Sequence, residues 1–375
     1  MVVIHYIASP FWGGGEQYIY NLSLALAQQK QTRCVFVCPT HTPDEILQRW
    51  SQLGHTYTLQ PHTKNGKFSF AEAFRLARII DKEQADVLHV HDIKDFFVCV
   101  YAKMFTRRTV RLIATRHLIA PAKNKPTWRW AYRHFDEMIF VSQMAADCFL
   151  AEKEIRNACR SIHVIHNSIP MLREKKVAGE PLRDQLGILP SLPIIFYQGR
   201  ICREKGIIAL LQAIAQHFSR QYAIVLAGSI DHEVQPDLEQ LLHHSPLTNY
   251  LFPIGFRTDT AAIIPECRLG LLPSIVPEAA SLSLLEFMAA GIPVIASNNG
   301  SQPEFATNEK EAILLPPGGQ WTEWIDTINR LIANEQQARA IGLHAQLRYR
   351  TDFDYHLFTE KIYAVYEGRI SHSER

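Results

Sequence analysis

The stretch LPSIVPEAASLSLLEFMAAGIPVIASNNGSQPE, from Leu272 to Glu304, contains the pattern that determines the fold of this chain. It begins at the end of the apolar run Leu269–Leu272, continues through a helical pattern, and reaches a second apolar run at Pro293–Ala296. A strand, a helix and a strand in this order predict a parallel sheet that is covered by helices.

The same alternation extends through the whole chain. It predicts an α/β fold of two tandem Rossmann-like, doubly wound domains. In such sheets ligands bind outside the carboxyl ends of the strands, so we expect the site in a cleft between two facing sheets. The expected strands are Val2–Ile7, Cys34–Cys38, Val87–His91, Leu112–Thr115, Met138–Val141, Ile162–Ile165, Ile194–Tyr197, Tyr222–Ala227, Leu269–Leu272, Pro293–Ala296 and Ala312–Leu315.

A polar interval separates the two halves. It extends from about Met171 to Ser191 and contains Lys175, Lys176 and Pro181, so we expect the linker there. The first domain is therefore expected to end near residue 170, and the second to begin at 171.

Composition excludes several classes of protein. The 375 residues include 39 Lys and Arg against 37 Asp and Glu, and a net charge of +2 excludes a globally basic nucleic-acid-binding protein. No apolar run approaches about 18 residues, so no membrane span is expected. The seven cysteines form no Cys-x-x-Cys pair, which indicates a reducing cytoplasm rather than a disulfide framework.

Two cations follow the first strand of the second half. Arg200 comes directly after the strand and Gly199, and Lys205-Gly206 opens the next helix. Two cations at the carboxyl end of a strand, beside a helix N-terminus, suit a diphosphate. The alternative is an ordinary solvated loop.

Glu286 interrupts an apolar helical stripe. Leu282, Leu285 and Ala289 share one side of the expected helix, and Glu286 lies within that side. A carboxylate there needs a partner, because an unpaired buried charge is costly. It either accepts hydrogen bonds from ligand hydroxyls, such as those of a ribose, or forms a structural salt bridge.

Glu278 lies eight positions before Glu286, between Pro277 and Ala279. Ser281 is the expected cap of the helix that follows. The small residues around Glu278 would let a ligand approach the backbone N–H groups closely. Alone, Glu278 is no more informative than any acidic residue in a loop.

These residues together resemble the group 1 (family 4) retaining glycosyltransferases, which have the two-domain GT-B fold. The hallmark is two glutamates separated by seven residues, which Glu278 and Glu286 match. The resemblance also covers MAAGIPVIAS, the later Pro303-Glu304 and LPPG segments, GRICREKG around Arg200, the glycine-rich loop Gly13-Gly14-Gly15-Glu16, and Ile165-His166-Asn167-Ser168. It extends over nearly the whole chain in the correct order.

The resemblance implies a role for each matching position. Arg200 and Lys205 would hold the donor diphosphate, Glu286 the ribose hydroxyls, and Glu278 the donor sugar. The backbone at Ala280, Ser281 and Leu282 would meet the sugar or pyrophosphate, and Gly14 and Gly15 would let the first loop approach the phosphate. The family usually has Gly-Phe-Gly where this chain has Ala279-Ala280-Ser281, which affects the fit of the donor sugar.

Histidines follow two strands of the first half. His117 comes after the strand Leu112–Thr115, where the family often has a histidine near the donor sugar; otherwise it caps the strand. His89 and His91, with Asp92, have a spacing that could suggest a metal. The resemblance implies no metal and no cofactor, so we expect His91 near the acceptor and His89 in a structural position.

A basic stretch lies between Phe96 and Phe135. It has no Asp or Glu, and its later charges interleave with the aromatic residues Trp128, Trp130, Tyr132 and Phe135. Residues 103–135 either bind an anionic membrane surface or form a core helix with solvated arginines. Its nine cations are Lys103, Arg107, Arg108, Arg111, Arg116, Lys123, Lys125, Arg129 and Arg133.

The resemblance implies an enzyme that transfers a sugar from a nucleotide-diphosphate donor, with a UDP-sugar favoured, to an acceptor hydroxyl, and the cysteine usage places it in the cytoplasm. The acceptor would be a glycan or lipid-linked glycan of the cell envelope, and the enzyme could sit peripherally on the inner face of the membrane. The alternatives are a sugar-nucleotide epimerase on the same fold and a catalytically silent binding scaffold. No nucleic acid is an expected partner.

The C-terminal stretch has apolar residues at helical spacing, including Phe358, Ile362 and Tyr366. In GT-B proteins the final helix crosses back onto the first domain. We therefore expect a first domain of 1–170 plus about 355–375, and a donor domain of 171–354.

Overall fold

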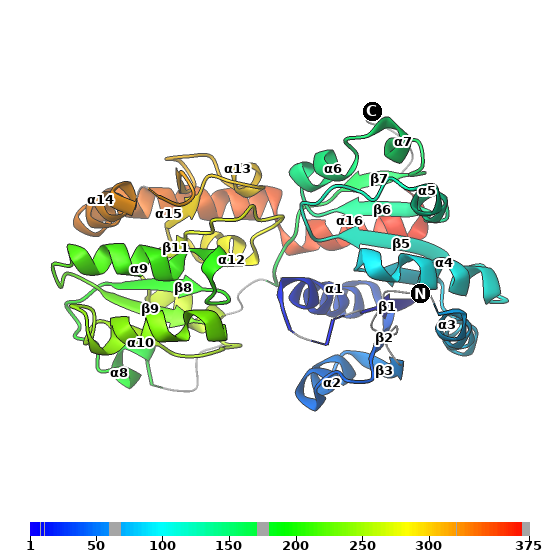
Figure 1. Ribbon diagram of the computed structural model, residues 1–375, viewed down its shortest axis with the longest axis horizontal. Helices are drawn as coiled ribbons and strands as arrows, with labels where there is room; N and C mark the ends of the chain where they lie inside the picture. Colours follow the sequence, from blue (N-terminus) through cyan, green and yellow to red (C-terminus); the bar gives the residue numbers. More distant parts are fainter. Residues whose placement is uncertain (8, 11, 60–68, 171–179, 320, 370–375) are drawn as a thin grey trace. The chain divides into compact units, whose positions relative to one another are not determined.

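The computed structural model describes residues 1–369 except 8, 11, 60–68, 171–179 and 320. It divides into two compact units, of which unit 1 comprises Met1–Pro170 and Asp354–Arg375 and unit 2 comprises Met171–Phe353. Each unit contains one parallel sheet with helices on both faces (Figure 1).

Unit 1 contains a seven-stranded parallel sheet in the order β3-β2-β1-β4-β5-β6-β7. The chain order reverses between β1 and β4, which are hydrogen-bonded neighbours with His5 opposite His89. The strands are β1 (Val2–Tyr6), β2 (Arg33–Pro39), β3 (Gly54–Leu59), β4 (Val87–Val90), β5 (Arg111–Arg116), β6 (Glu137–Phe140) and β7 (Ile162–Val164).

Alternate strand residues of unit 1 enter different cores, as the two-residue period of a strand requires. On β1, Ile4 and Tyr6 pack with α3 to α7, whereas Val3 packs with α1, α2 and α16. The helices are α1 (Gly14–Lys30), α2 (Asp44–Ser51), α3 (Phe70–Glu83), α4 (Phe96–Phe105), α5 (Pro126–Tyr132), α6 (Gln143–Phe149), α7 (Lys153–Arg156) and α16 (Tyr355–Glu367).

The last helix, α16, belongs to unit 1 although it follows the whole of unit 2 in the sequence. Its buried face includes Phe358 and Ile362, which pack beside Leu22 of α1. The Tyr366 hydroxyl lies 2.6 Å from His89 Nδ1. Residues far apart in the sequence therefore complete one core.

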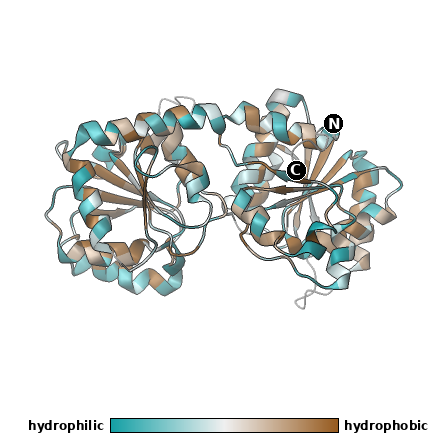
Figure 2. Ribbon diagram, turned by 90° about the horizontal axis from the view of Figure 1, so that it is seen from above, coloured by the Kyte–Doolittle hydropathy of each residue, from teal (hydrophilic) through white to brown (hydrophobic). Residues whose placement is uncertain are grey.

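Unit 2 contains a six-stranded parallel sheet in the order β10-β9-β8-β11-β12-β13. In Figure 2 the strands of both sheets are mostly brown, whereas the covering helices alternate between teal and brown. This pattern is typical of parallel sheets that are buried on both faces. The strands are β8 (Ile194–Gln198), β9 (Ala223–Ala227), β10 (Leu251–Pro253), β11 (Leu269–Leu272), β12 (Val294–Ser297) and β13 (Ile313–Leu315).

The helices of unit 2 pack on both faces of its sheet. One face carries the core formed with α9, α10, α14 and α15. On the other, Phe287 of α12 packs against Phe196 of β8 with ring centroids 6.1 Å apart. The helices are α8 (Leu182–Gln185), α9 (Ile207–Gln216), α10 (Gln235–His243), α11 (Thr260–Ile263), α12 (Leu282–Ala290), α13 (Gln302–Phe305), α14 (Trp321–Ala333) and α15 (Glu335–Asp352).

All eleven expected strands are present, and their bounds differ from the expected ones by at most one residue at each end. The sequence analysis missed β3 and β10. The expected linker was too long, because residues 182–185 form α8 and Leu182 is buried. Residues 171–179 of that interval lie outside the described part.

No helix among the described residues has both the length and the apolar character needed to cross a membrane. All seven cysteines are free, and Cys34 and Cys38 are buried on β2.

Candidate active site

The candidate site of unit 2 lies where the strand order reverses, between β8 and β11. The loops that leave neighbouring parallel strands in opposite directions at such a point form a crevice for ligands. Here these loops are residues 199–206, after β8, and residues 273–281, after β11. They carry most of the residues expected to bind the donor.

The first loop carries two cations, Arg200 and Lys205, whose side chains have different environments. Tyr197 donates from its hydroxyl to the carbonyl oxygen of Arg200 at 2.7 Å, which fixes the backbone there. The Arg200 side chain is 58% exposed and lies 3.6 Å from Asp231. Lys205 is less exposed and turns to the second loop.

Lys205 and Glu278 form an ion pair, with Nζ and Oε1 2.5 Å apart. The same carboxylate oxygen accepts a hydrogen bond from the Ser274 hydroxyl at 2.6 Å. The expected phosphate-binding cation and the expected sugar-binding carboxylate are therefore in contact. This pairing did not follow from the sequence analysis.

Two glycines permit the close packing of the loop around Glu278. Gly206 has φ +69°, and a Cβ there would lie 2.2 Å from the carbonyl oxygen of Pro273. Gly300 has φ +55°, and a Cβ there would lie 2.5 Å from the backbone N and O of Glu278. Ser301 completes the support by donating from its hydroxyl to the Glu278 carbonyl at 2.9 Å.

Glu286 lies on α12 and accepts a hydrogen bond from the side-chain amide of Gln198, at the end of β8. Burial raises the pKa of Glu286 to about 7, although the hydrogen bond from Gln198 opposes this shift. Ser283 donates to the Gln198 carbonyl at 3.1 Å and so holds the strand end against the helix. The partner of Glu286 is an amide, so the interpretation of Glu286 as half of a structural salt bridge was wrong.

Ser281 caps α12, as expected. Its side chain accepts a hydrogen bond from the backbone N–H of Leu284, and α12 begins at Leu282. Among the described residues, neither Ala279 nor Ala280 has a positive φ. The backbone therefore adopts this conformation without the glycines that the family usually has.

The glycine-rich loop of unit 1 passes directly into α1. Gly13 is the N-cap, and its N–H donates to the Glu16 carboxylate at 3.0 Å. A Cβ on Gly14 or Gly15 would meet no atom within 4 Å. The backbone of these two glycines is therefore accessible to a ligand.

Histidines gather at the carboxyl ends of β1, β4 and β5. His91 lies 3.1 Å from His5 and 3.2 Å from His117, measured between ring nitrogens. Burial lowers the pKa of His5 and of His117 to about 3, and the charge of Arg116 also lowers that of His117. His117 therefore lies at a strand end in a neutral form.

His5, His89 and His91 place one possible ligand atom each within 4.8 Å of one another, which a metal ion could use. However, His89 already bonds Tyr366 through Nδ1 and Thr115 through Nε2, at 2.6 and 2.7 Å. Hydrogen bonds thus account for both nitrogens of His89, consistent with the structural position expected for it.

Part of the basic stretch is buried in the core of unit 1 or paired with acidic side chains. Tyr132 and Phe135, two of its aromatic residues, are fully buried. Lys103, Arg108 and Arg111 pair with Asp136, Asp86 and Glu137, and Arg116 is buried. The aromatic residues at 132 and 135 therefore belong to the core, as the alternative interpretation proposed.

Two family models match the chain in succession. Glycosyltransferase Family 4 matches residues 12–171, and Glycosyl transferases group 1 matches residues 180–348. The chain is a group 1 glycosyltransferase. It is therefore an enzyme that uses a nucleotide-sugar donor.

Relatives of this glycosyltransferase are distant. It is 25% identical over 304 residues to N-acetyl-alpha-D-glucosaminyl L-malate synthase of Bacillus anthracis, a match that covers 80% of this chain and 78% of that protein. It is 27% identical over 213 residues to lipopolysaccharide 1,2-N-acetylglucosaminetransferase of Salmonella typhimurium, a match that covers 54% of this chain and 55% of that protein.

A solved structure has the same fold as this glycosyltransferase. HepE (Alr3699) of Anabaena, solved in complex with UDP, has a TM-score of 0.79 and 21% sequence identity, covering 98% of this chain and all of HepE. Together with the two parallel sheets, this similarity confirms the expected GT-B fold.

Several polar residues of the site were missed in the sequence analysis of this glycosyltransferase. Gln198 bonds Glu286, Ser274 bonds Glu278, and Asp231 lies beside Arg200. Gln198 had a signal, since it is a polar residue at the carboxyl end of an apolar strand. Ser274 and Asp231 had none, because only the fold brings their loops to the site.

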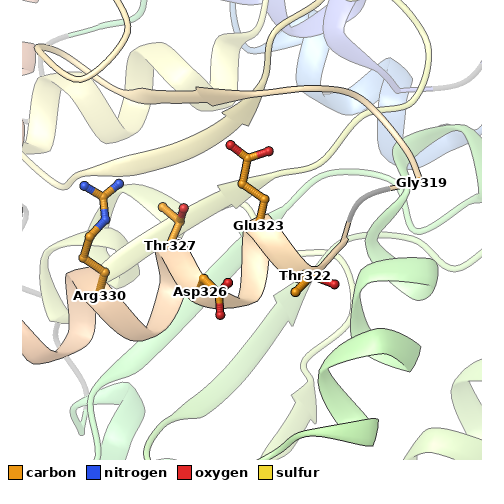
Figure 3. A pocket seen from close by; sticks show the side chains of 6 residues that line it. All are labelled: Gly319, Thr322, Glu323, Asp326, Thr327 and Arg330. Atoms are coloured by element: carbon orange, nitrogen blue, oxygen red, sulfur yellow. The ribbon is translucent and has the colours of Figure 1, made fainter.

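A surface hollow of about 550 Å³ is lined by residues of α14 and by Gly319, which precedes that helix (Figure 3). Its walls include the carboxylates of Glu323 and Asp326 and one cation, Arg330. Two carboxylates against one cation would repel a diphosphate. The hollow therefore does not compete with the strand-end site as the place for a donor.

Proposed function

We propose that this enzyme transfers a sugar, with retention of anomeric configuration, from a nucleotide-diphosphate sugar to a hydroxyl of a glycan or lipid-linked glycan in cell-envelope polysaccharide synthesis. The observation that carries the proposal is that Lys205, Glu278 and Glu286 lie near the carboxyl ends of the central strands β8 and β11, beside the N-terminus of α12. A cation beside a helix N-terminus suits a diphosphate, and a buried carboxylate suits ribose hydroxyls.

Donor binding would change the partner of Lys205. Its ammonium leaves Glu278 for a phosphate oxygen, while Glu278 keeps the hydrogen bond from Ser274 and accepts from a donor-sugar hydroxyl. The Arg200 guanidinium leaves the solvent-exposed Asp231 and pairs with the same diphosphate. The first-turn N–H groups of α12 at Leu282 and Ser283 have no intrahelical partner and complete the anion site.

The transfer step then needs no enzyme nucleophile. The bond between the anomeric carbon and the phosphate oxygen breaks, and its electron pair leaves with the diphosphate. The acceptor oxygen bonds to the anomeric carbon on the same face, and its proton passes to the diphosphate oxygen. Arg200, Lys205 and the N-terminus of α12 stabilise the negative charge that develops.

The UDP-bound HepE structure and the match to a lipopolysaccharide N-acetylglucosaminyltransferase support a UDP-sugar donor and an envelope glycan acceptor. The proposed reaction uses no resident metal or cofactor. A chelator should therefore leave turnover unchanged, and loss of turnover that Mg²⁺ or Mn²⁺ restores would contradict this part of the proposal.

Thermal-shift titration with UDP, GDP, ADP and their sugar conjugates tests the donor. A ligand at a hundred times its Kd stabilises the protein by about 2.7 kcal/mol, which is readily measured. We expect one base to shift the melting temperature in the wild type and not in Lys205→Ala. An unchanged melting temperature with every nucleotide and sugar conjugate would contradict the proposal.

Product analysis separates this transferase from the two alternatives. With the bound donor and a glycan acceptor, a transferase forms a glycoside whose anomeric linkage matches that of the donor. An epimerase would convert the donor sugar with no acceptor present, and a scaffold would bind the donor without turnover. A glycoside of inverted configuration would overturn retention while leaving transfer intact.

We also propose an anionic bilayer as the partner of unit 1, through an aromatic–arginine face that shares Met104, Phe105 and Arg107 with the expected stretch 103–135 and otherwise lies on α3. On α3 and α4, Phe70, Phe74, Met104 and Phe105 are exposed by 39% to 57%. The Phe105 ring centroid lies 6.3 Å from that of Phe70 and 6.5 Å from that of Phe74. The exposed arginines of α3 and of the turn after α4 are Arg75, Arg78 and Arg107, and the Arg78 guanidinium lies 5.9 Å from the centroid of the Phe74 ring.

The chemistry of this face favours a lipid surface. In the described part of the chain, Arg75, Arg78 and Arg107 form no ion pair with any acidic side chain. Exposed aromatic rings together with arginines that have no acidic partner suit the boundary between acyl chains and anionic headgroups. A lipid-linked acceptor would then be met at the membrane on which it lies.

Vesicle flotation at low salt tests the membrane proposal. Each cation near an anionic surface contributes about 1 kcal/mol, so Arg75→Gln with Arg78→Gln should weaken binding to phosphatidylglycerol vesicles roughly 30-fold. Leu343→Ser with Leu347→Ser, two exposed leucines on α15, is the matched control and should bind like the wild type. Equal binding to phosphatidylcholine vesicles, or no binding at low salt, would remove the proposal.

A further inference from the structure

Three histidines form a continuous hydrogen-bonded row at the strand ends of unit 1. His5 lies on β1, and His91 and His117 directly follow β4 and β5. Because β4 pairs with both β1 and β5, His91 lies between the other two. His5 Nδ1 lies 3.1 Å from His91 Nε2, and His91 Nδ1 lies 3.2 Å from His117 Nε2.

All three rings are neutral at physiological pH. His5 is fully buried, His91 is 9% exposed, and His117 is partly exposed at the outer end of the row. Burial lowers the pKa of each, and for His91 the neighbouring histidines lower it further. A neutral imidazole carries one N–H and one bare nitrogen, so it donates once and accepts once.

This rule makes the row directional. His91 uses both nitrogens, so it accepts from one neighbour and donates to the other, and the two hydrogen bonds run in the same sense. At the inner end, His5 Nε2 is buried and has no hydrogen-bond partner in the described part of the chain. Buried N–H groups without acceptors are rarer than under-satisfied acceptors, which makes Nε2 the bare nitrogen of His5.

The bare Nε2 of His5 determines which nitrogen carries the proton in each of the three rings. His5 carries its proton on Nδ1 and donates to His91 Nε2, and His91 donates from Nδ1 to His117 Nε2. His117 is left with its proton on Nδ1, the nitrogen outside the row. The Tyr18 ring packs edge-on against His117, with centroids 4.7 Å apart, and restrains the plane of the imidazole.

We infer that His5 and His91 are positioning residues that hold His117 in the tautomer with N–H on Nδ1, so that it presents a neutral hydrogen-bond donor to the sugar substrate. The inference rests on the proposed function for the identity of that ligand. A neutral donor binds a hydroxyl oxygen without a charge that the buried site would have to stabilise. His89 is outside the row, because its nitrogens bond Tyr366 and Thr115.

Nitrogen NMR of the whole enzyme labelled with ¹⁵N-histidine tests the inference directly. The chemical shifts and ring couplings distinguish a protonated Nδ1 from a protonated Nε2 for each histidine. We expect His117 of the wild type to be protonated on Nδ1. Protonation on Nε2, a charged ring at pH 7.5, or a row that binds one equivalent of added Zn²⁺ would each overturn the inference.

Two substitutions at the buried end test positioning. The amide N–H of His5→Asn can still donate to His91, and we expect it to keep the tautomer of His117 and most of the turnover. His5→Phe removes the donor, and we expect mixed tautomers of His117 with kcat lowered about tenfold and the donor KM little changed. Equal losses in the two variants would show that His5 acts only through packing.

His89→Gln is the matched control, because it alters the same core but leaves the row intact. We expect His117 in this variant to keep its proton on Nδ1. If His5→Phe does not fold, the wild-type tautomer and its persistence in His5→Asn still decide the question. The tautomer of His117 is measured without any turnover by the enzyme. A failure of this inference is therefore distinguishable from a failure of the proposed transfer reaction.

Discussion

Among single residues, Glu286 gives this enzyme a pH dependence near neutrality. The pKa of its buried carboxyl is about 7, and the proposed role requires the ionised form to accept from ribose hydroxyls. Below pH 7 a donor must displace a proton, so its affinity should fall about tenfold for each further pH unit and level off above pH 7.

Calorimetric titration of a UDP-sugar between pH 5.5 and 8.5 measures this effect, because the diphosphate of the sugar conjugate does not titrate in that range. Glu286→Gln cannot ionise, so it should bind more weakly at pH 8 and show no slope. A wild-type affinity that stays level from pH 5.5 to 8.5 would contradict the assignment of Glu286 to the ribose.

The variants Arg200→Ala and Lys205→Ala should lose similar amounts of activity but differ in their free energy of unfolding. Alanine at either position removes a preorganised cation, which typically costs about 3–4 kcal/mol of barrier, so turnover should fall at least about a hundredfold. Arg200→Ala should leave the unfolding free energy within about 0.5 kcal/mol, because its pairing with Asp231 is exposed. Near-normal turnover in either variant would contradict the proposed diphosphate site.

Lys205→Ala should be the less stable of the two variants, because it leaves the largely buried Glu278 without its cation. Urea unfolding compares the two variants, and Lys205→Ala combined with Glu278→Gln should recover part of the lost stability. No recovery in the double variant would show that the ion pair does not contribute through charge.

The sequence was sufficient to predict side chains whose environment is set locally. Glu286 interrupts an apolar stripe and Ser281 precedes a helix, and both were predicted from neighbours a few positions away. The contact between Lys205 and Glu278 was not predictable, because it joins positions 73 residues apart in the sequence. Such a pair depends on which strands become neighbours at the switch point.

At the level of elements, the histidine-bearing ends of β1, β4 and β5 should make the fold sensitive to acid. Burial holds the pKa of His5 and His117 near 3 and lowers those of His89 and His91 well below 6.5. The groups facing them are Tyr18 of α1, Tyr366 of α16 and, on β5, Thr115 and Arg116.

The sign of this effect follows from proton binding. Below pH 6.5 the unfolded chain binds protons at these histidines that the folded chain does not bind, so stability is complete above pH 6.5 and falls as the pH drops toward 3. Glu286 acts in the opposite sense, because its raised pKa makes the folded state bind a proton between about pH 4.5 and 7.

Urea unfolding of Glu286→Gln between pH 7.5 and 5 therefore removes the opposing contribution of Glu286, and the raised pKa values of Asp95 and Glu16 contribute equally with or without His5. We expect the unfolding free energy to fall with decreasing pH, and the slope to become shallower in His5→Asn, which removes one titrating group. An equal slope with and without His5→Asn would contradict the neutral state of His5.

Strands with continuous apolar runs were predicted well, whereas β3 and β10 were not. Residues of β3 (Gly54–Leu59) are all partly buried or exposed, and the strand lies at the edge of its sheet. β10 has three residues and is also an edge strand. Edge strands need less apolar sequence because only one neighbour and part of each face cover them, so their signal is weak.

For the whole molecule, the return of the chain to unit 1 has a consequence for folding. Unit 2 is continuous from Met171 to Phe353, whereas unit 1 needs α16 after it. Five apolar or aromatic side chains of α16 are buried in the core of unit 1. They are Tyr355, Phe358, Ile362, Val365 and Tyr366.

Truncation after Phe353 should therefore unfold unit 1 and spare unit 2. Burying five such side chains contributes roughly 8–15 kcal/mol, which is comparable with the whole stability of a domain, about 5–15 kcal/mol. Limited proteolysis should then digest residues 1–170 and leave a resistant fragment near 171–353, and adding a peptide of residues 354–375 should restore protection. A truncated chain with both units protected would show that α16 covers a core that is already complete without it.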